Sequence, residues 1–212
     1  MSVATVNVVE TFTSLQGEST FAGRPCFFIR LAGCNLRCRY CDSTYAYEGG
    51  RDRAVADLAA EFTASGVSLA EITGGEPLLQ AACPDLALAL REAGAEVLVE
   101  TNGSLDIGAI PAGVVAVMDI KCPGSGASGS VDWANIGRLR PDDQVKFVIG
   151  DRADFDWACG LVRAHGLDSR CRAVLFSPVA PQLAPATLGA WLLETKLPVQ
   201  LQVQLHKLIG MK

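Results

Sequence analysis

Short apolar segments alternate with helix-like segments along this sequence, and the alternation limits the possible folds more than any other feature. Strands are expected at residues 26–32, 69–73, 96–100, 114–120, 145–149, 172–176 and 199–204. Helices are expected at residues 52–65, 78–93, 154–165 and 186–195. Such an order predicts parallel strands joined by helices, in an α/β sheet or barrel whose chemistry gathers where the strands end.

Length and composition are those of one globular domain over residues 1–212, with residues 1–25 as an addition to the core. Half of the residues are hydrophobic, and 18 Lys and Arg against 23 Asp and Glu give a net charge of −5. A mildly acidic chain disfavours nucleic acid as a partner, and no apolar run is long enough to cross a membrane. The first residues lack the pattern of a signal peptide, so we expect a cytoplasmic protein.

Three of the eight cysteines lie close together, as Cys34, Cys38 and Cys41, in the spacing C-x3-C-x2-C. Clustered cysteines in a reducing compartment bind metal or carry out redox chemistry more often than they form disulfides. Three local thiolates suit an iron–sulfur cluster that keeps one iron open to a ligand. The alternative is a structural zinc ion with a distant fourth ligand, Cys122 or His206, although the usual paired spacing is missing. The other five cysteines are expected to be small buried side chains.

Polar motifs follow several expected strands. Thr73-Gly74-Gly75-Glu76-Pro77 is either a tight strand-to-helix turn or a backbone that approaches a ligand closely. Further polar residues at later strand ends are Asn102, Asp119, Lys121 and Ser177. Capping and turn formation would explain some of them equally well.

The two ends of the chain also carry polar residues. Gln16 and Glu18 offer donors and acceptors for the edge of a heterocycle. Arg30 lies inside an apolar strand, so it either meets an anion or points to solvent from an edge strand. His206 lies in a tail, Gln202–Lys207, that alternates polar and apolar residues like a strand with one wet face.

The cysteine loop with Tyr40 before its last cysteine resembles the cluster motif of the radical S-adenosylmethionine (SAM) superfamily. That resemblance implies a [4Fe–4S] cluster on Cys34, Cys38 and Cys41, and SAM bound at its open iron as the source of a 5′-deoxyadenosyl radical. It also implies a set of SAM-binding residues, with Glu76 on the amino group: Tyr40, Asp42, Gly74, Gly75, Glu76, Asn102, Asp119, Lys121 and Ser177.

Nearly the whole chain resembles one family within that superfamily, the 7-carboxy-7-deazaguanine synthases. The resemblance rests on residues 15–18, Arg30, the cysteine loop through Ser43, residues 73–77, Glu100-Thr101-Asn102-Gly103 and the Gln204–Lys207 tail. It implies an incomplete (β/α)6-type TIM barrel with N- and C-terminal additions. The implied reaction is that of a carbon–nitrogen lyase, which turns 6-carboxy-5,6,7,8-tetrahydropterin into 7-carboxy-7-deazaguanine with loss of ammonia, toward queuosine and other 7-deazapurines.

The same resemblance implies further ligands and partners. The pterin would bind residues from both ends of the chain: Leu15, Gln16, Gly17, Glu18, Arg30, Thr73 and His206. Mg²⁺ would bind at Ser43 together with substrate oxygens, a flavodoxin-like redox protein would donate electrons, and the protein would be a homodimer. Two positions depart from the family pattern, because Ser19 replaces a common Gly and Ser43 a common Thr.

Two other interpretations remain open at this point. A glycyl-radical-enzyme activase also carries C-x3-C-x2-C, but it would not need a tight heterocycle site. A zinc-binding interaction module would use the cysteines without any redox chemistry.

Overall fold

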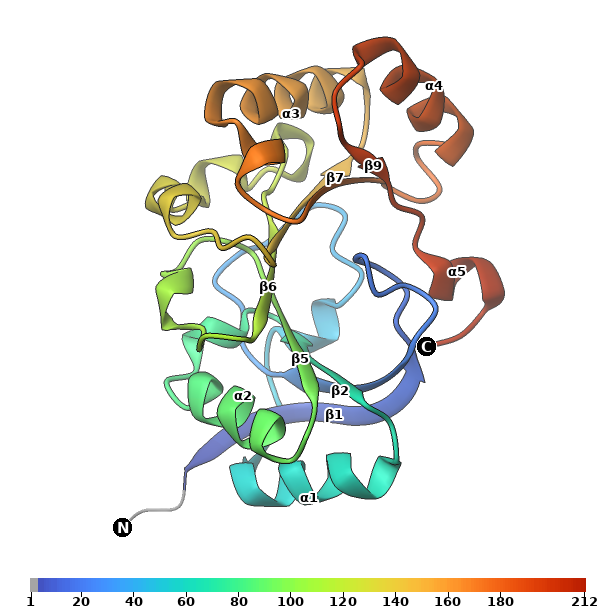
Figure 1. Ribbon diagram of the computed structural model, residues 1–212. Coiled ribbons are helices and arrows are strands. Elements are labelled where there is room, and N and C mark those ends of the chain that lie inside the picture. The colour runs from blue at the N-terminus through green and yellow to red at the C-terminus, as the bar shows by residue number, and fades with distance from the viewer. Residues whose placement is uncertain (1–3) are drawn as a thin grey trace.

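The computed structural model describes residues 4–212, and its centre is one continuous mixed sheet (Figure 1). Its strands are β1 Thr5–Leu15, β2 Pro25–Leu31, β3 Arg51–Ala54, β4 Leu69–Gly74, β5 Glu96–Thr101, β6 Val115–Asp119, β7 Gln144–Ile149, β8 Ala173–Pro178 and β9 Gln200–Leu201. Their order is β3-β1-β2-β4-β5-β6-β7-β8-β9. All pairs from β2 to β9 are parallel, whereas β1 runs antiparallel to β2 and β3.

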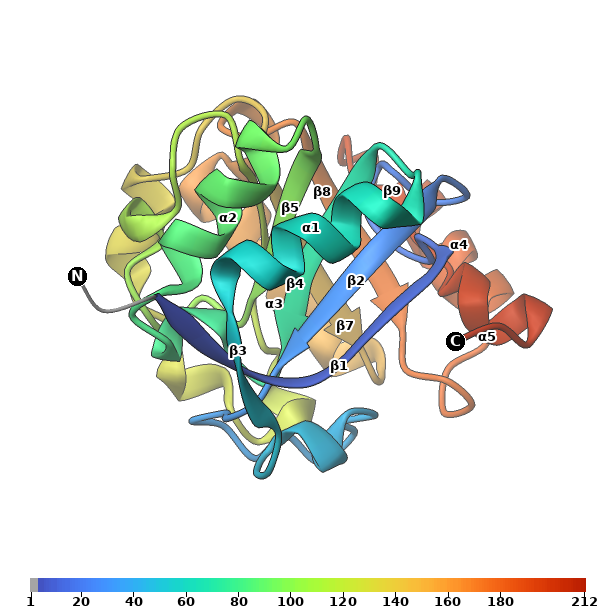
Figure 2. The same cartoon turned by 90° about the horizontal axis from the view of Figure 1, so that it is seen from below.

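Helices cover the outer face of this curved sheet. They are α1 Val55–Ser65, α2 Cys83–Glu92, α3 Arg152–His165 and α4 Pro185–Thr195. The short α5 Leu205–Ile209 is not part of this layer and packs against the segment around Gly17. Figure 2 shows α1 and α2 lying across the strands on one side. Strands β3 and β9 end the sheet on opposite edges, so the barrel is incomplete, as the sequence predicts.

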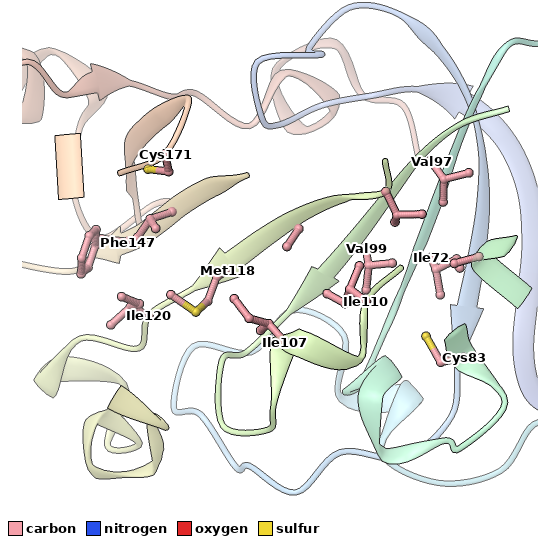
Figure 3. Packing of buried hydrophobic residues seen from close by; sticks show 14 of the residues in the cluster. Ile72, Cys83, Val97, Val99, Ile107, Ile110, Met118, Ile120, Phe147 and Cys171 are labelled. Carbon is pink, nitrogen blue, oxygen red and sulfur yellow. The ribbon is translucent and has the colours of Figure 1, made fainter. Parts of the chain in front are cut away.

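Two apolar clusters hold the sheet in place. The larger lies between the strands and the helices, where Ile72 and Val99 of the sheet share a layer with Cys83 of α2 (Figure 3). The smaller one fills the bottom of the barrel interior with Phe21, Cys26, Phe28, Leu69 and Leu98. Side chains alternate across a strand, so the next inward residues above this apolar floor line the interior that remains open.

The helix expected at residues 78–93 is interrupted. Pro77–Leu79 form a 3-10 turn, and α2 begins only at Cys83. The reason lies in Gln80, whose side-chain amide donates to the backbone oxygens of Asn7 and Ala32 at 2.9 Å each. These long-range contacts hold Gln80 in an extended conformation and tie the turn to β1 and β2.

The C-terminal strand expectation is largely wrong. Residues 199–204 yield only the two-residue β9, and residues 205–209 form α5 instead of a strand. The alternation over six residues is too short to distinguish a strand from an irregular segment that leads into a helical turn. The segment before Cys26, expected as an addition to the core, contributes β1, which runs antiparallel to β2; residues 1–3 lie outside the described residues.

Among residues 4–212, no helix combines the length and the apolar composition that crossing a membrane requires.

Candidate active site

A pocket of about 640 Å³ opens above the apolar floor of the barrel. It brings together residues from the N-terminal segment, the cysteine loop, the ends of β4 to β7 and the C-terminal tail. Almost every residue that the sequence analysis assigned to a ligand lines it: Leu15, Gln16, Gly17, Glu18, Arg30, Cys34, Cys38, Tyr40, Cys41, Asp42, Ser43, Thr73, Gly74, Gly75, Asn102, Asp119, Lys121 and His206. The exceptions are Glu76 and Ser177.

The cysteine loop leaves β2 and folds along one wall of the pocket. Its conformation is fixed by contacts to distant backbone, since Tyr40 Oη donates to Val148 O at 3.0 Å and Arg39 N to Ser125 O at 2.9 Å. All three loop cysteines are free and half-buried, whereas the other five are buried, as expected for small apolar side chains. The pocket therefore receives three thiol groups from one short loop.

The thiols fit a polynuclear cluster better than a single ion. Among the described residues, no three His, Cys, Asp or Glu side chains converge closely enough to hold one metal ion. A [4Fe–4S] cluster does not need that convergence, because each thiolate binds a different iron atom. Burial raises the pKa of the Cys38 thiol, and Asp119, Cys41 and Cys34 add to this while Lys121 opposes it. A bound cationic cluster would relieve the repulsion among the three thiolates.

Gly74 and Gly75 bring the end of β4 against the cysteine loop. A Cβ at Gly75 would lie 2.0 Å from Gly33 O, and one at Gly74 would lie 2.2 Å from Leu31 O. Gly75 N donates to Leu31 O at 3.1 Å. This backbone contact leaves no room for a side chain, which explains why the turn contains two glycines.

Glu76 is placed differently from the expectation that it binds an ammonium group. Its side chain is fully buried and accepts hydrogen bonds from Asn102 N at 2.7 Å, Thr101 Oγ1 at 2.8 Å and Leu78 N at 3.0 Å. Burial raises the pKa of this carboxyl, although these three hydrogen bonds act to lower it. In this geometry Glu76 links the ends of β4 and β5 and does not face the pocket.

The ends of β5 and β6 supply polar groups beside the cysteine loop. Asn102 Nδ2 donates to Asn35 Oδ1 at 3.0 Å, and Lys121 Nζ donates to Asp119 Oδ2 at 2.8 Å. Asp119 Oδ1 is buried without a hydrogen-bond partner among the described residues. An acceptor in this position fits a ligand hydroxyl group. The hydroxyl of Ser177 is likewise buried and unpartnered there; Ser177 does not line the pocket, although its neighbour in register, Val148, does.

Arg30 lies on β2, between β1 and β4, and therefore not at an edge of the sheet. Its charge is paired within the protein. Arg30 Nε lies 3.0 Å from Glu10 Oε1, and Arg30 Nη1 reaches Ser43 Oγ at 3.5 Å. Burial opposes the ionisation of Glu10, but hydrogen bonds from Lys212, Arg30 and Tyr45 lower its pKa. The sequence analysis did not find Glu10 as the partner, because the β1–β2 register that sets Glu10 opposite Arg30 is not visible in either segment alone.

His206 comes from α5 and packs against Gly17, where a Cβ would lie 2.0 Å from His206 Nδ1. The tail is fixed by Leu205 N, which donates to Gly17 O at 2.9 Å, and by an ion pair of 2.7 Å between Lys207 Nζ and Asp42 Oδ2. The C-terminal tail therefore lies against the segment that follows β1, as the C-terminus beside the blue ribbon in Figure 1 shows.

Three further charged residues line the interior, namely Glu71, Glu100 and Lys146. Lys146 Nζ lies 2.7 Å from Glu18 Oε2 and 3.4 Å from Asp119 Oδ2, and it also contacts Glu100. These carboxylates raise the pKa of Lys146 well above its ordinary value despite its burial. The sequence analysis gave them no role, although Glu71 and Lys146 each interrupt an apolar strand, as Arg30 does.

Comparisons with known proteins agree with this geometry. The Radical SAM superfamily model matches residues 28–176. A 7-carboxy-7-deazaguanine synthase from Koribacter versatilis is 42% identical, with 96% of each chain covered. One from Chlorobaculum tepidum is also 42% identical, with 97% of this chain and 94% of the relative covered. A crystal structure of QueE from Escherichia coli shares the fold, with a TM-score of 0.79 at 22% identity and 95% of each chain covered.

Proposed function

The chain belongs to the radical SAM superfamily and, within it, to the 7-carboxy-7-deazaguanine synthases, and from that premise we propose how its pocket divides between cofactors and substrate. It is an enzyme of 7-deazapurine biosynthesis that uses a [4Fe–4S] cluster and SAM. Its reaction converts 6-carboxy-5,6,7,8-tetrahydropterin into 7-carboxy-7-deazaguanine with loss of ammonia. The observation that carries the division is one pocket lined both by the three thiols of the cysteine loop and by polar residues of the N-terminal segment and the C-terminal tail.

The cofactor side is formed by the cysteine loop and the ends of β4 to β6. When bound, the cluster and SAM supply a 5′-deoxyadenosyl radical. Cys34, Cys38 and Cys41 would hold the cluster, and the backbone at Gly74 and Gly75 lies against the start of this loop. We assign the remaining polar groups to SAM, namely Tyr40, Asp42, Asn102, Asp119 and Lys121, all of which line the pocket.

Glu76 and Ser177 remain part of this SAM assignment with altered roles. Glu76 orders the ends of β4 and β5 through its three hydrogen bonds, and so positions the backbone that meets SAM. Ser177 is fully buried beside Val148, so it would contact SAM only if the pocket extended to it along β8.

The substrate side is formed by the two chain ends and the inward residues of β2 and β4. Arg30 provides the cation for the pterin carboxylate, at the cost of its pairing with Glu10. Leu15, Gln16, Gly17 and Glu18 form the wall against which His206 lies, and Thr73 projects from β4. A close fit is needed because hydrogen transfer requires the reacting carbons to lie almost in contact.

We place Mg²⁺ at Ser43, between the two sides. Ser43 Oγ donates to Asp42 Oδ1 at 3.1 Å, and Arg30 lies within reach of the same oxygen. Mg²⁺ prefers six oxygen ligands, and one hydroxyl cannot hold it. The substrate carboxylate and carbonyl oxygens would complete the shell, so the ion and the substrate would bind together.

Partners and location follow the same proposal. Arg37 and Arg39 are exposed on the cysteine loop of a chain with net charge −5, which favours an acidic flavodoxin-like protein as electron donor. Exposed apolar side chains near the C-terminal end favour a homodimer. We expect the protein in the cytoplasm, where thiols stay reduced.

One anaerobic assay tests the function. The protein is reconstituted with iron and sulfide, then mixed with dithionite, SAM, Mg²⁺ and carboxytetrahydropterin, and the products are identified by mass spectrometry. We expect 7-carboxy-7-deazaguanine in excess over the SAM consumed. Release of 5′-deoxyadenosine without this product would contradict the substrate assignment and favour a protein substrate. A colourless protein with stoichiometric zinc would contradict the radical chemistry.

A further inference from the structure

Glu71 differs from the other carboxyl groups that line the pocket. Those other groups are Glu18, Asp42, Glu100 and Asp119, and each lies beside a lysine ammonium group. For Glu71, the described residues contain no such ion pair, and its side chain accepts a hydrogen bond from Gln16 Nε2. Glu71 is therefore the pocket carboxyl that no cation of the protein already occupies.

Glu71 lies at the lowest polar level of the pocket. On β4 it precedes Thr73 by two residues, so both side chains point to the same face of the strand. Its neighbours in register are Phe28 on β2 and Leu98 on β5, and both belong to the apolar floor. The side chain is 5% exposed and still lines the pocket, so any group that meets it must come from a ligand that reaches this floor.

The charges around Glu71 favour its protonated form in the free protein. Burial and the facing carboxylate of Glu100 raise its pKa to about 8, and Glu18 adds to this. Gln16 and Lys146 of β7 act in the opposite direction. The Cys26 thiol of β2 also faces Glu71, and burial raises the pKa of that thiol as well, so it stays neutral. A ligand that offers N–H donors would favour the ionised form of Glu71.

The charged groups of the pocket follow the same order as the polar groups of a pterin, with a cation at one end and a carboxyl at the other. Arg30 lies in register with Thr73, one inward level above Glu71 on the neighbouring strand. A 6-carboxypterin carries its carboxylate at one end of the fused rings and its 2-amino and N3–H donors at the other end. A ring whose carboxylate meets Arg30 would direct this donor edge toward the floor.

We infer that Glu71 recognises the 2-amino-4-oxo edge of the pterin, with its two carboxylate oxygens accepting from the 2-amino group and from N3–H. This inference rests on the proposed function and adds a specificity-determining residue to it. On binding, Glu71 gives its proton to the solvent, and no covalent bond changes. Glu18 is less suited to this role, because it already accepts from Lys146, Gln202 and Gln204.

Two air-stable ligands test the recognition. In 6-carboxylumazine the 2-amino group of 6-carboxypterin is replaced by a carbonyl, so it turns an acceptor toward the floor. We expect the reconstituted protein with SAM to bind 6-carboxypterin at least about tenfold more tightly than 6-carboxylumazine, as one charge-assisted hydrogen bond allows. Glu71→Gln offers one donor and one acceptor, so the preference should vanish or reverse. Glu92→Gln, an exposed carboxyl on α2, is the matched control.

Proton release gives a readout that a purely structural role would not produce. Calorimetry at pH 7 in two buffers of different ionisation enthalpy should show release of about one proton per bound pterin in the wild type and none in Glu71→Gln. Glu71→Asp keeps a carboxyl and should retain the preference with weaker affinity, which guards against a variant that does not fold.

The outcomes distinguish a failure of the inference about Glu71 from a failure of the proposed function. If Glu71→Gln keeps both the preference and the proton release, the inference is wrong and the proposed function stands. If the wild type binds neither ligand nor the product 7-carboxy-7-deazaguanine, the proposed function fails together with the inference.

Discussion

At the scale of single residues, Arg30 tests the proposed substrate site. Arg30 is largely buried and 3.0 Å from Glu10. If it binds the substrate carboxylate as proposed, its removal would leave that carboxylate without a cation. We expect Arg30→Ala to raise KM for the pterin by about 10- to 100-fold, the range of a charged hydrogen bond, with a smaller effect on kcat. Steady-state kinetics would measure this. Arg24→Ala removes an exposed pair with Glu96 and serves as control. A normal KM in Arg30→Ala would place Arg30 outside the substrate site.

Ser43 is the residue through which Mg²⁺ dependence can be tested. Its hydroxyl is the group proposed as ligand, and it already contacts Asp42 and Arg30. Activity titrated with Mg²⁺ should show weaker stimulation in Ser43→Ala, because one oxygen ligand is lost. Ser43→Thr keeps the hydroxyl and should retain the stimulation. Equal stimulation in Ser43→Ala and the wild type would remove Ser43 from the metal site.

The raised pKa of Glu71 predicts how the free energy of unfolding changes with pH. Its pKa is 4.5 ordinarily and about 8 in the folded protein, so the folded state holds the proton more tightly than the unfolded state. Its contribution is therefore complete below pH 4.5 and is lost as pH rises to about 8. Between pH 5 and 8 we expect Glu71→Gln to gain stability relative to the wild type by up to about 1.4 kcal/mol per pH unit.

Urea unfolding at several pH values would measure that difference. Glu10, Glu18, Asp42 and Asp119 have lowered pKa values and lose their contributions only in acid. Glu76, whose pKa is also raised, is present in both proteins, so its contribution cancels in the difference. A constant difference between the two proteins from pH 5 to 8 would contradict a raised pKa at Glu71.

The same residue scale shows what the sequence could and could not predict. Arg30 stood out because a charge inside an apolar strand is costly without a partner. Glu71 in Leu69–Gly74 and Lys146 in Gln144–Ile149 carry the same signal, and applying it to every strand would have found them. The partners themselves, such as Glu10 for Arg30, depend on strand register and could not be derived from the residues alone.

At the scale of elements, α5 forms one wall of the pocket with little packing of its own. It has five residues, none of them buried, and Leu205 N and Lys207 Nζ attach it to the rest of the chain. Such a segment opens at low free-energy cost. Gly17→Ala would place a Cβ 2.0 Å from His206 Nδ1 and displace this helix. We expect faster hydrogen exchange at residues 204–209 and a raised KM, with little change in Tm.

Hydrogen-exchange mass spectrometry with and without 6-carboxypterin would check this prediction. In the wild type the ligand should slow exchange in α5 and leave α1 unchanged, since Leu58 and Phe62 of α1 are already buried in the core. Gly160→Ala is the control, because a Cβ there meets no atom within 4 Å. Unchanged exchange in Gly17→Ala would show that α5 does not depend on contact with the N-terminal segment.

Strands and helices could be predicted where a run of apolar residues in the local sequence specifies them. β2, β4 and β7 appear at nearly the expected residues, because mostly apolar runs specify them. β3 was not expected, and its residues 51–54 replace the start of the helix expected at residues 52–65. The break before α2 was not predictable, because Gln80 bonds to backbone at Asn7 and Ala32, far away in the sequence. Tertiary contacts override local propensity in both this break and α5.

At the scale of the whole molecule, the incomplete barrel places its apolar floor, its charged pocket residues and its cysteine loop one above another along the barrel. The apolar floor closes one end, the layer around Lys146 and Glu71 lies above it, and the cysteine loop lies at the carboxyl ends of the strands. A barrel that stays open between β3 and β9 leaves room for both chain ends to form the wall beside the pocket. The alternation of strands and helices predicted a parallel α/β sheet or barrel, whereas the incomplete barrel and the meeting of residues 15–18 with His206 came from the family resemblance.

Apolar side chains are exposed on the C-terminal elements α4, β9 and α5 and just after them. Of the nine large hydrophobic residues exposed in the described part of the chain, five fall between residues 193 and 211: Leu193, Leu201, Leu208, Ile209 and Met211. Leu193 at the end of α4 is 85% exposed. Exposed apolar residues gathered on neighbouring elements are typical of a protein interface.

If a second copy of the chain covers this face, a charge introduced there should separate the dimer. We expect Leu193→Glu to raise the dimer dissociation constant at least about tenfold, because an unpaired carboxylate would be buried in the interface. Sedimentation velocity at several concentrations would measure it. Leu88→Glu is the matched control, since Leu88 is also exposed but lies on α2, between β4 and β5 in the middle of the sheet, whereas α4 lies between β8 and β9 at its edge. A dimer that survives Leu193→Glu but dissociates in Leu88→Glu would move the interface to the α2 side, and a wild-type monomer would contradict the homodimer.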